Sequence, residues 1–197
     1  MKHLPNILTI ARLILSLLMF VALAAIGAQA LPDLAAWLIR FAVAAFIIAA
    51  VTDFFDGWLA RRWSVTSLIG AILDPIADKI LVCGAILGLL AVRAPWVLIP
   101  GGVILFREFA VSALREVLAP RGIKLPVTFL AKTKTTLQLF ALGALMIIWF
   151  WPVWGLIIPV EQLHAMYLTA ALTLDVAAVV TVWTGVEYAL AARKALT

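Results

Sequence analysis

The chain has 197 residues, of which 66% are apolar and only 13% are charged. Soluble domains carry roughly 25% charged residues, so this composition excludes an ordinary soluble protein and predicts an all-α integral membrane protein. The net charge of +5 does not indicate a nucleic-acid partner, because basic residues in a membrane protein first set its orientation. A membrane-spanning helix needs about 20 residues, so one domain over residues 1–197 has room for six or seven.

Six apolar spans are predicted in chain order. They run near residues 7–29, 34–60, 69–92, 95–119, 129–151 and 163–191. The first span follows basic residues and resembles a secretory signal. Because further apolar spans follow it, we expect this segment to be retained as the first transmembrane helix.

The distribution of lysine and arginine predicts the orientation of these spans. Basic residues gather at the two ends of the chain and in the second and fourth loops: Lys2, Arg12, Arg61, Arg62, Arg121, Lys124, Lys132, Lys134, Arg193 and Lys194. Cytoplasmic loops carry an excess of such residues. Both termini are therefore predicted to lie in the cytoplasm.

Four aspartates interrupt the second and third spans: Asp53, Asp56, Asp74 and Asp78. A carboxylate at the bilayer centre costs at least ~2.5–3.5 kcal/mol, so these groups need compensation. Residues three or four apart share a helix face, and a short loop makes the two spans antiparallel. The four carboxylates are thus predicted to converge just below the cytoplasmic surface.

The chemistry of this cluster indicates a metal site. Carboxylates without a nearby histidine or cysteine suit Mg²⁺, Mn²⁺ or Ca²⁺. Four negative charges match two divalent ions, the arrangement that clamps a phosphoryl transfer. The alternative is a divalent-cation transporter, which would not need Gly57, Arg61 and Gly70 at their present spacing.

Taken alone, the residues around the aspartates leave alternatives open. Gly57 and Gly70 allow close approach either of a ligand or of another helix. Arg61 either holds a phosphate group or only sets the topology.

Together these residues form one ordered motif, Asp53-x2-Asp56-Gly57-x2-Ala60-Arg61-x8-Gly70-x3-Asp74-x3-Asp78. The motif resembles the complete signature of the CDP-alcohol phosphotransferase family. The resemblance implies a fold of six transmembrane helices, usually in a homodimer. It also implies a reaction in which an alcohol attacks the β-phosphorus of a CDP-linked lipid and CMP leaves.

The resemblance further implies a role for each position of the motif. The four aspartates would hold two divalent ions, Mg²⁺ or Mn²⁺, and Asp78 would also act as the general base. The contacts to the CDP-lipid would come from Asp56, Gly57, Ala60, Arg61, Gly70 and Asp74.

Other segments resemble the bacterial phosphatidylglycerophosphate synthases of this family: NILTIAR, LDPIADKILV, REFAVSALRE, FLAKTKTTLQLFAL and TVWTGVEYALAARKAL. One departure is Ala131, where that group usually has glycine. The likeness implies a bacterial inner-membrane enzyme that uses CDP-diacylglycerol and sn-glycerol 3-phosphate. Phosphatidylglycerol (a cardiolipin synthase), inositol phosphate and serine stay open as other acceptors.

An acceptor that bears a phosphate needs cations. The candidates on the fourth and fifth spans are Arg107, Arg115, Lys132 and Lys134. The structural alternative for Arg107 and Arg115 is salt bridging with Glu108, Glu116 or the aspartates.

Three further groups have no firm assignment from the sequence. Asn6, Thr9 and Arg12 either cap the site from the first span or only start an interfacial helix, and the second interpretation is favoured. Gln138 is a candidate for an added hydrogen bond. Asp175 lies well inside the sixth span and has no assigned role.

Overall fold

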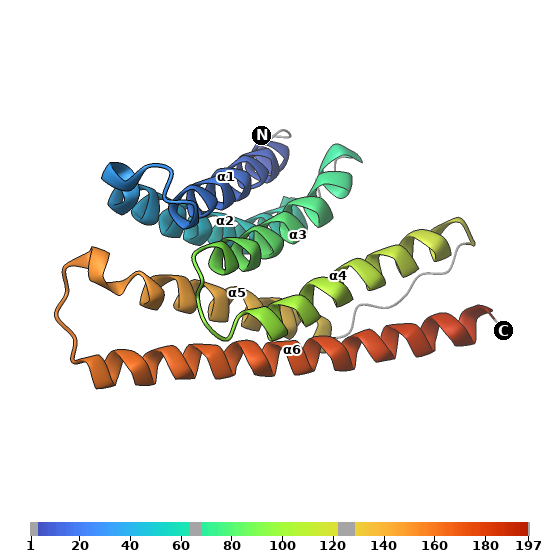
Figure 1. Cartoon of the computed structure of the whole chain (residues 1–197). Helices are drawn as coiled ribbons and strands as arrows, with labels where there is room; N and C mark the ends of the chain where they lie inside the picture. Colours follow the sequence, from blue (N-terminus) through green and yellow to red (C-terminus); the bar gives the residue numbers. More distant parts are fainter. Residues whose placement is uncertain (1–3, 64–67, 122–128, 197) are drawn as a thin grey trace. The chain divides into compact units, whose positions relative to one another are not determined.

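The computed structural model describes residues 4–63, 68–121 and 129–196. Of residues 4–5, 54–63, 68–71, 121, 129, 131–132 and 195–196 it describes only the backbone. Over these ranges the chain forms the helices α1 (Leu4–Gly27), α2 (Ala35–Trp63), α3 (Leu68–Ala91), α4 (Leu98–Leu118), α5 (Phe129–Trp149) and α6 (Val160–Leu196), shown in Figure 1. Three 3₁₀ helices accompany them, η1 (Pro32–Leu34), η2 (Ala119–Arg121) and η3 (Trp151–Trp154). The predicted all-α class is confirmed, each of the six predicted apolar spans coincides with one of the long helices, and the described residues contain no strand.

The long helix α6 extends beyond its predicted range at both ends. It begins at Val160, directly after Pro159, a residue that cannot continue a helix backwards because it lacks an amide hydrogen. Glu161 lies in its first turn, and Arg193 and Lys194 lie in its last turn. These charges oppose the helix dipole at both ends, which favours helical structure outside the purely apolar part.

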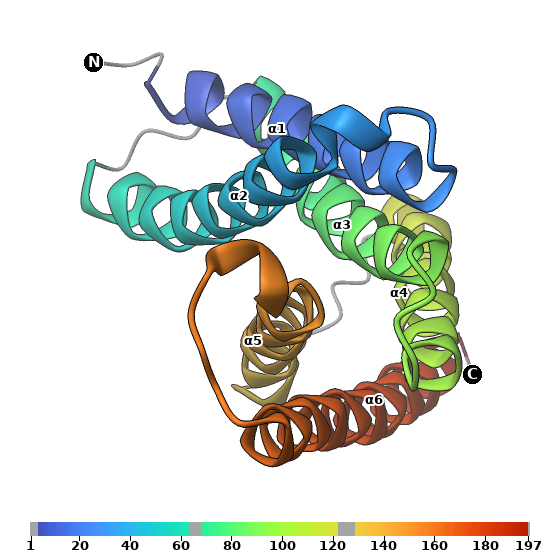
Figure 2. The same ribbon diagram turned by 60° about the vertical axis from the view of Figure 1, so that its left-hand side comes forward.

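The chain forms two compact units. The first comprises Met1–Pro95 and Met146–Pro159, and the second comprises Trp96–Leu145 and Val160–Thr197. In the first unit α1 packs against both α2 and α3, as Figures 1 and 2 show. Its core contains Met19, Leu23, Ile86 and Leu89, all of which are fully buried.

In the second unit α4 packs against α6. Ile104 and Leu174 are fully buried there, and Val111 is nearly so. Two polar contacts connect α5 with the same unit: Gln138 donates to Thr181 of α6, and Lys134 pairs with Glu108 of α4.

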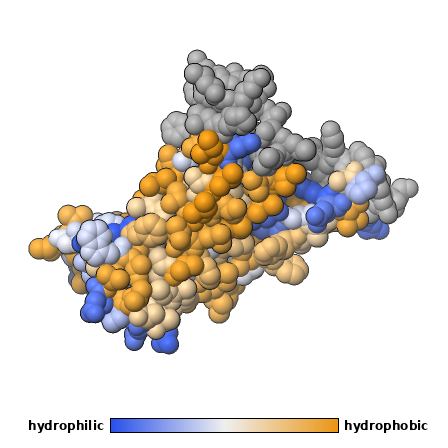
Figure 3. Space-filling view, turned by 90° about the horizontal axis from the view of Figure 1, so that it is seen from above, coloured by the Kyte–Doolittle hydropathy of each residue, from blue (hydrophilic) through white to orange (hydrophobic). Residues whose placement is uncertain are grey.

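Within the described residues three helices are long and apolar enough to cross a membrane. These spans are Asn6–Gly27, Pro32–Asp53 and Val160–Lys194, and Thr133–Trp149 is a shorter apolar helix. Large apolar side chains such as Ile99, Phe106 and Ile157 are exposed, and apolar side chains cover much of the face in Figure 3. A surface of this kind is suited to lipid contact, so the chain is a helical membrane protein.

Close packing in the first unit depends on glycine. A Cβ placed on Gly27 would lie 2.4 Å from the backbone oxygen of Ala91, so the ends of α1 and α3 approach each other there. A Cβ on Gly88 would lie 2.4 Å from Cδ1 of Leu23. Small residues at helix interfaces are the usual means of close packing in membranes.

We predict that Gly27→Ala lowers the free energy of unfolding by about 1–3 kcal/mol, the usual cost of overpacking. Gly102→Ala is the matched control, because a Cβ on Gly102 meets no atom within 4 Å. Alanine is favoured over glycine inside a helix by roughly 0.5–1 kcal/mol, so this control should be neutral or slightly stabilising. Thermal unfolding of the purified protein in detergent measures both changes, and equal melting temperatures would contradict the packing argument.

Candidate active site

One face of α1 brings together the described aspartates of the motif. Nη1 of Arg12 donates to Oδ1 of Asp53 at 2.6 Å and to Oδ1 of Asp78 at 2.8 Å. Arg12 is only 2% exposed. Since a buried charge is stable only when it is paired, this guanidinium ties α1 to both α2 and α3.

Thr9 lies one turn before Arg12 on the same face of α1. Its Oγ1 donates to Oδ1 of Asp74 at 2.6 Å. Asp53, Asp74 and Asp78 therefore converge on a single turn of α1, as the antiparallel arrangement of the second and third spans predicted. The sequence favours an interfacial helix start for Asn6, Thr9 and Arg12 over a capping role, whereas in the structure Thr9 and Arg12 contact the aspartates directly.

The carboxylates remain accessible although Arg12 is buried. The side chains of Asp53 and Asp78 are 32% and 45% exposed. The carboxylates of Asp53 and Asp78 are therefore partly exposed, whereas the guanidinium that pairs with them is buried.

The described aspartates offer the kind of donor atom that a divalent ion takes, but the described side chains do not by themselves form a complete metal site. Oδ1 of Asp53 and Oδ1 of Asp78 both contact Nη1 of Arg12. Two carboxylates from different helices therefore bind a positive charge at the same point between them. An oxygen-only donor set of this kind suits Mg²⁺ or Mn²⁺. Among the described side chains no group of three or more histidine, cysteine, aspartate or glutamate residues has a metal-holding arrangement.

Part of the predicted site lies outside the described side chains. These residues are Asp56, Gly57, Ala60, Arg61, Gly70 and Lys132. Their assignments remain predictions from the sequence motif.

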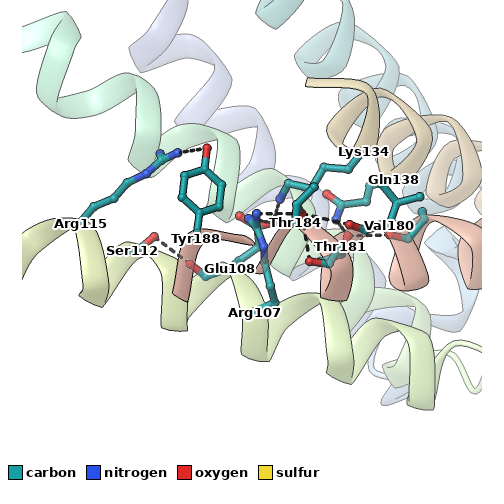
Figure 4. Close-up of polar contacts among 11 residues, drawn as sticks. Arg107, Glu108, Ser112, Arg115, Lys134, Gln138, Val180, Thr181, Thr184 and Tyr188 are labelled. Atoms are coloured by element: carbon teal, nitrogen blue, oxygen red, sulfur yellow. Dashed lines mark hydrogen bonds and ion pairs between the residues drawn. The ribbon is translucent and has the colours of Figure 1, made fainter. Parts of the chain in front are cut away.

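The second unit contains a cluster of cations on α4 and α5, shown in Figure 4. Arg107 is 8% exposed and donates through Nη2 to Oγ1 of Thr184 at 3.0 Å. Glu108 pairs with Lys134 and, at 3.4 Å, with Nη1 of Arg107. The salt bridge given as the structural alternative for Arg107 is thus present in the structure. Arg107 and Lys134 both pair with the carboxylate of Glu108.

Tyr188 of α6 lies against both arginines of α4 (Figure 4). The guanidinium carbons of Arg107 and Arg115 are 5.4 and 5.0 Å from the centre of its ring. Nη2 of Arg115 also donates to the Tyr188 hydroxyl oxygen at 2.9 Å. Cation–π contacts of this kind hold a guanidinium in place. Tyr188 therefore orients Arg115 and, because it is uncharged, does not neutralise the positive charge of the arginine.

Sequence reasoning missed the residues of α6 that support this cluster. Thr181, Thr184 and Tyr188 are spaced three and four residues apart, so they form a polar stripe on one face of an apolar helix. That periodicity was the available signal. Gly185 lies within the stripe, and a Cβ there would come within 3.0 Å of Cγ of Arg107.

Asp175 lies apart from these residues. It lines a largely apolar cavity of about 660 Å³ beside α4 and α6, together with Glu187. None of the predicted site residues lines this cavity.

Comparison with known proteins gives the motif its context. The sequence profile of the CDP-alcohol phosphatidyltransferases matches residues 2–186. The chain belongs to the CDP-alcohol phosphatidyltransferase family. This confirms the resemblance seen in the aspartate motif.

Several curated proteins are similar to this family member. One from Rickettsia bellii is 38% identical over 195 residues, covering 98% of this chain and 97% of the relative. One from Salmonella choleraesuis is 39% identical over 194 residues, covering 97% and 95%. One from Cereibacter sphaeroides is 46% identical over 143 residues, covering 72% of this chain and 62% of the relative's length. All three are named CDP-diacylglycerol–glycerol-3-phosphate 3-phosphatidyltransferase.

We predict that Glu108→Gln destabilises this CDP-alcohol phosphatidyltransferase by about 3 kcal/mol, because removing one member of a buried ion pair leaves the other charge uncompensated. Glu116→Gln, at an exposed position of the same helix, is the matched control and should change stability by less than ~0.5 kcal/mol. Thermal or denaturant unfolding in detergent separates the two variants. Equal stability would show that Arg107 and Lys134 do not depend on Glu108.

Proposed function

We propose that this CDP-alcohol phosphatidyltransferase transfers the phosphatidyl group of CDP-diacylglycerol to sn-glycerol 3-phosphate. The products are phosphatidylglycerophosphate and CMP. The observation that carries the proposal is the convergence of Asp53, Asp74 and Asp78 on α1. Relatives that match nearly the whole chain bear the name of this activity, which supports the choice of donor and acceptor.

The metal ligands are proposed from the motif and the donor chemistry. Asp53, Asp56, Asp74 and Asp78 would hold two divalent ions, Mg²⁺ or Mn²⁺. When bound, such ions supply positive charge beside the diphosphate of the donor.

The chain's own residues perform the remaining chemistry. Asp78 accepts the proton of the attacking hydroxyl group, as a general base must be within hydrogen-bond reach to do. The hydroxyl oxygen forms a bond with the β-phosphorus, and the bond from that phosphorus to the oxygen of CMP breaks. Arg61 would stabilise the charge of the diphosphate, and Gly57, Ala60 and Gly70 would leave room for the cytidine.

The acceptor phosphate is assigned to the cations Arg107, Arg115, Lys132 and Lys134. Arg107 and Lys134 share the single carboxylate of Glu108, so positive charge exceeds negative charge in this cluster. Arg115 is held by Tyr188. A guanidinium that is already oriented loses less side-chain entropy when it binds a phosphate.

The proposed cellular arrangement follows from the charges and the family. All six long helices would cross the bacterial inner membrane, in a homodimer of single-domain chains. Both termini and the active site would face the cytoplasm, which agrees with Arg193 and Lys194 in the last turn of α6. The acyl chains of the donor would then stay in the bilayer while its diphosphate lies at the interface.

We predict that Asp78→Asn lowers kcat at least ~100-fold, since general-base catalysis typically contributes 10²–10⁴-fold. Asp175→Asn is the matched control on another helix and should keep wild-type activity. The assay follows the incorporation of labelled glycerol 3-phosphate into lipid in mixed micelles that contain CDP-diacylglycerol, with and without a chelator. Undiminished turnover in Asp78→Asn, or full activity in the chelator, would contradict the assigned roles.

We also predict that Arg115→Gln raises KM for glycerol 3-phosphate at least about tenfold, because a hydrogen bond to a charged group is worth about 1.5–3 kcal/mol. KM for CDP-diacylglycerol should not change. Arg93→Gln, at an exposed position before α4, is the control.

An acceptor panel completes this experiment. Serine, inositol phosphate and phosphatidylglycerol should give little product. A preference for any of them would overturn the proposed acceptor while leaving the donor chemistry intact.

A further inference from the structure

Arg12 is the one residue of α1 whose charge meets the aspartate motif directly. The helix around it is apolar, and Arg12 is almost fully buried. A buried guanidinium is costly unless carboxylates compensate it. No part of the proposed reaction uses this residue, although it contacts two carboxylates that the proposal assigns to metal.

The geometry of Arg12 resembles that of a bridging cation. A single nitrogen, Nη1, lies 2.6 Å from Oδ1 of Asp53 and 2.8 Å from Oδ1 of Asp78. These carboxylates come from α2 and α3, and because both contact the same nitrogen they lie close enough to repel each other. The guanidinium therefore offsets the repulsion between the two carboxylates, as a metal ion between α2 and α3 would.

We propose that Arg12 is a positioning residue that holds the place of a divalent ion between Asp53 and Asp78 in the metal-free protein. Metal binding then competes with this ion pair. The inference rests on the proposed function, because it takes the two aspartates to be metal ligands.

Charge explains why only a divalent ion would compete well. Two carboxylates with one guanidinium keep an excess negative charge, and a monovalent ion in place of the guanidinium would not reduce it. A divalent ion neutralises the pair. Arg12 thus keeps the three helices of the first unit together before metal arrives, at the cost of a lower metal affinity.

A second contact from the same face of α1 supports a fixed register of this helix against the carboxylates. Thr9 donates to Asp74 on the same face of α1. The helix therefore presents Thr9 and Arg12 to the carboxylates in a single register.

The test measures Mn²⁺ binding and thermal unfolding of the full chain in detergent, without any CDP-lipid. Free Mn²⁺ is followed by electron paramagnetic resonance for wild type and for Arg12→Gln. In chelator, we expect Arg12→Gln to melt at a lower temperature than wild type. Addition of Mn²⁺ should raise its melting temperature by more than that of wild type. Its Mn²⁺ affinity should be at least about fivefold higher, within the usual 5- to 150-fold range of coupling between two binding events.

Two further variants make the result specific. Arg40→Gln removes an exposed arginine of α2 that donates to the backbone oxygen of Val153 at 3.1 Å, and it should leave Mn²⁺ affinity unchanged. Arg12→Lys keeps the charge but lacks the planar fork of the guanidinium. Its Mn²⁺ affinity should lie between those of wild type and Arg12→Gln.

The outcomes separate this inference from the proposed function. Recovery of folded Arg12→Gln only in the presence of Mn²⁺ supports the inference. If Arg12→Gln is not recovered at all, Arg12→Lys decides, and an affinity no higher than that of wild type overturns the role of Arg12. Unchanged or weaker Mn²⁺ binding by folded Arg12→Gln also overturns the role of Arg12. A wild-type protein that binds no Mn²⁺ overturns the proposed metal site itself.

Discussion

The first unit depends on compensating the negative charge of Asp53 and Asp78. Both carboxylates belong to helices that are otherwise apolar, and the structure supplies one buried guanidinium, Arg12, within hydrogen-bond distance of both. This contact requires α1 to lie against α2 and α3 at once. Close approach of the helices is in turn possible because glycine replaces larger residues where α1 meets α3. The ion pairs of Arg12 and the close packing of the helices in this unit therefore depend on each other.

The second unit has an excess of cations instead of an excess of carboxylates. One shared carboxylate, Glu108, and neutral groups of α6 stabilise these cations. Tyr188 holds guanidinium groups through its ring and its hydroxyl, and this leaves their positive charge uncancelled. A cluster built in this way is stable enough to fold and still attracts an anion. In the proposed function, this uncancelled charge binds the phosphate of the acceptor.

Family membership decides between two functions that the carboxylates alone left open, a transporter and an enzyme, because both would use oxygen ligands for divalent ions. The structural and the ligand-binding interpretations of the glycines and Arg61 both stay predictions. The profile match over residues 2–186 places the motif in a phosphatidyltransferase. In the proposed function, the aspartate motif serves the lipid donor and the cation cluster on α4 and α5 serves the soluble alcohol.

The amino-acid sequence by itself determined the helical ranges, the membrane class, the shared faces of the aspartates and the set of cations on α4 and α5. These features depend on hydropathy and on helical periodicity, which are local. Only the tertiary structure decided that Arg12 pairs with Asp53 and Asp78, that Thr9 reaches Asp74, and that Tyr188 contacts two arginines. The hydrogen-bonded partners among them lie 41 to 73 residues apart in the chain. Their meeting depends on how each helix is rotated about its axis, and this rotation is set by side-chain packing between helices, which spacing along one helix does not specify.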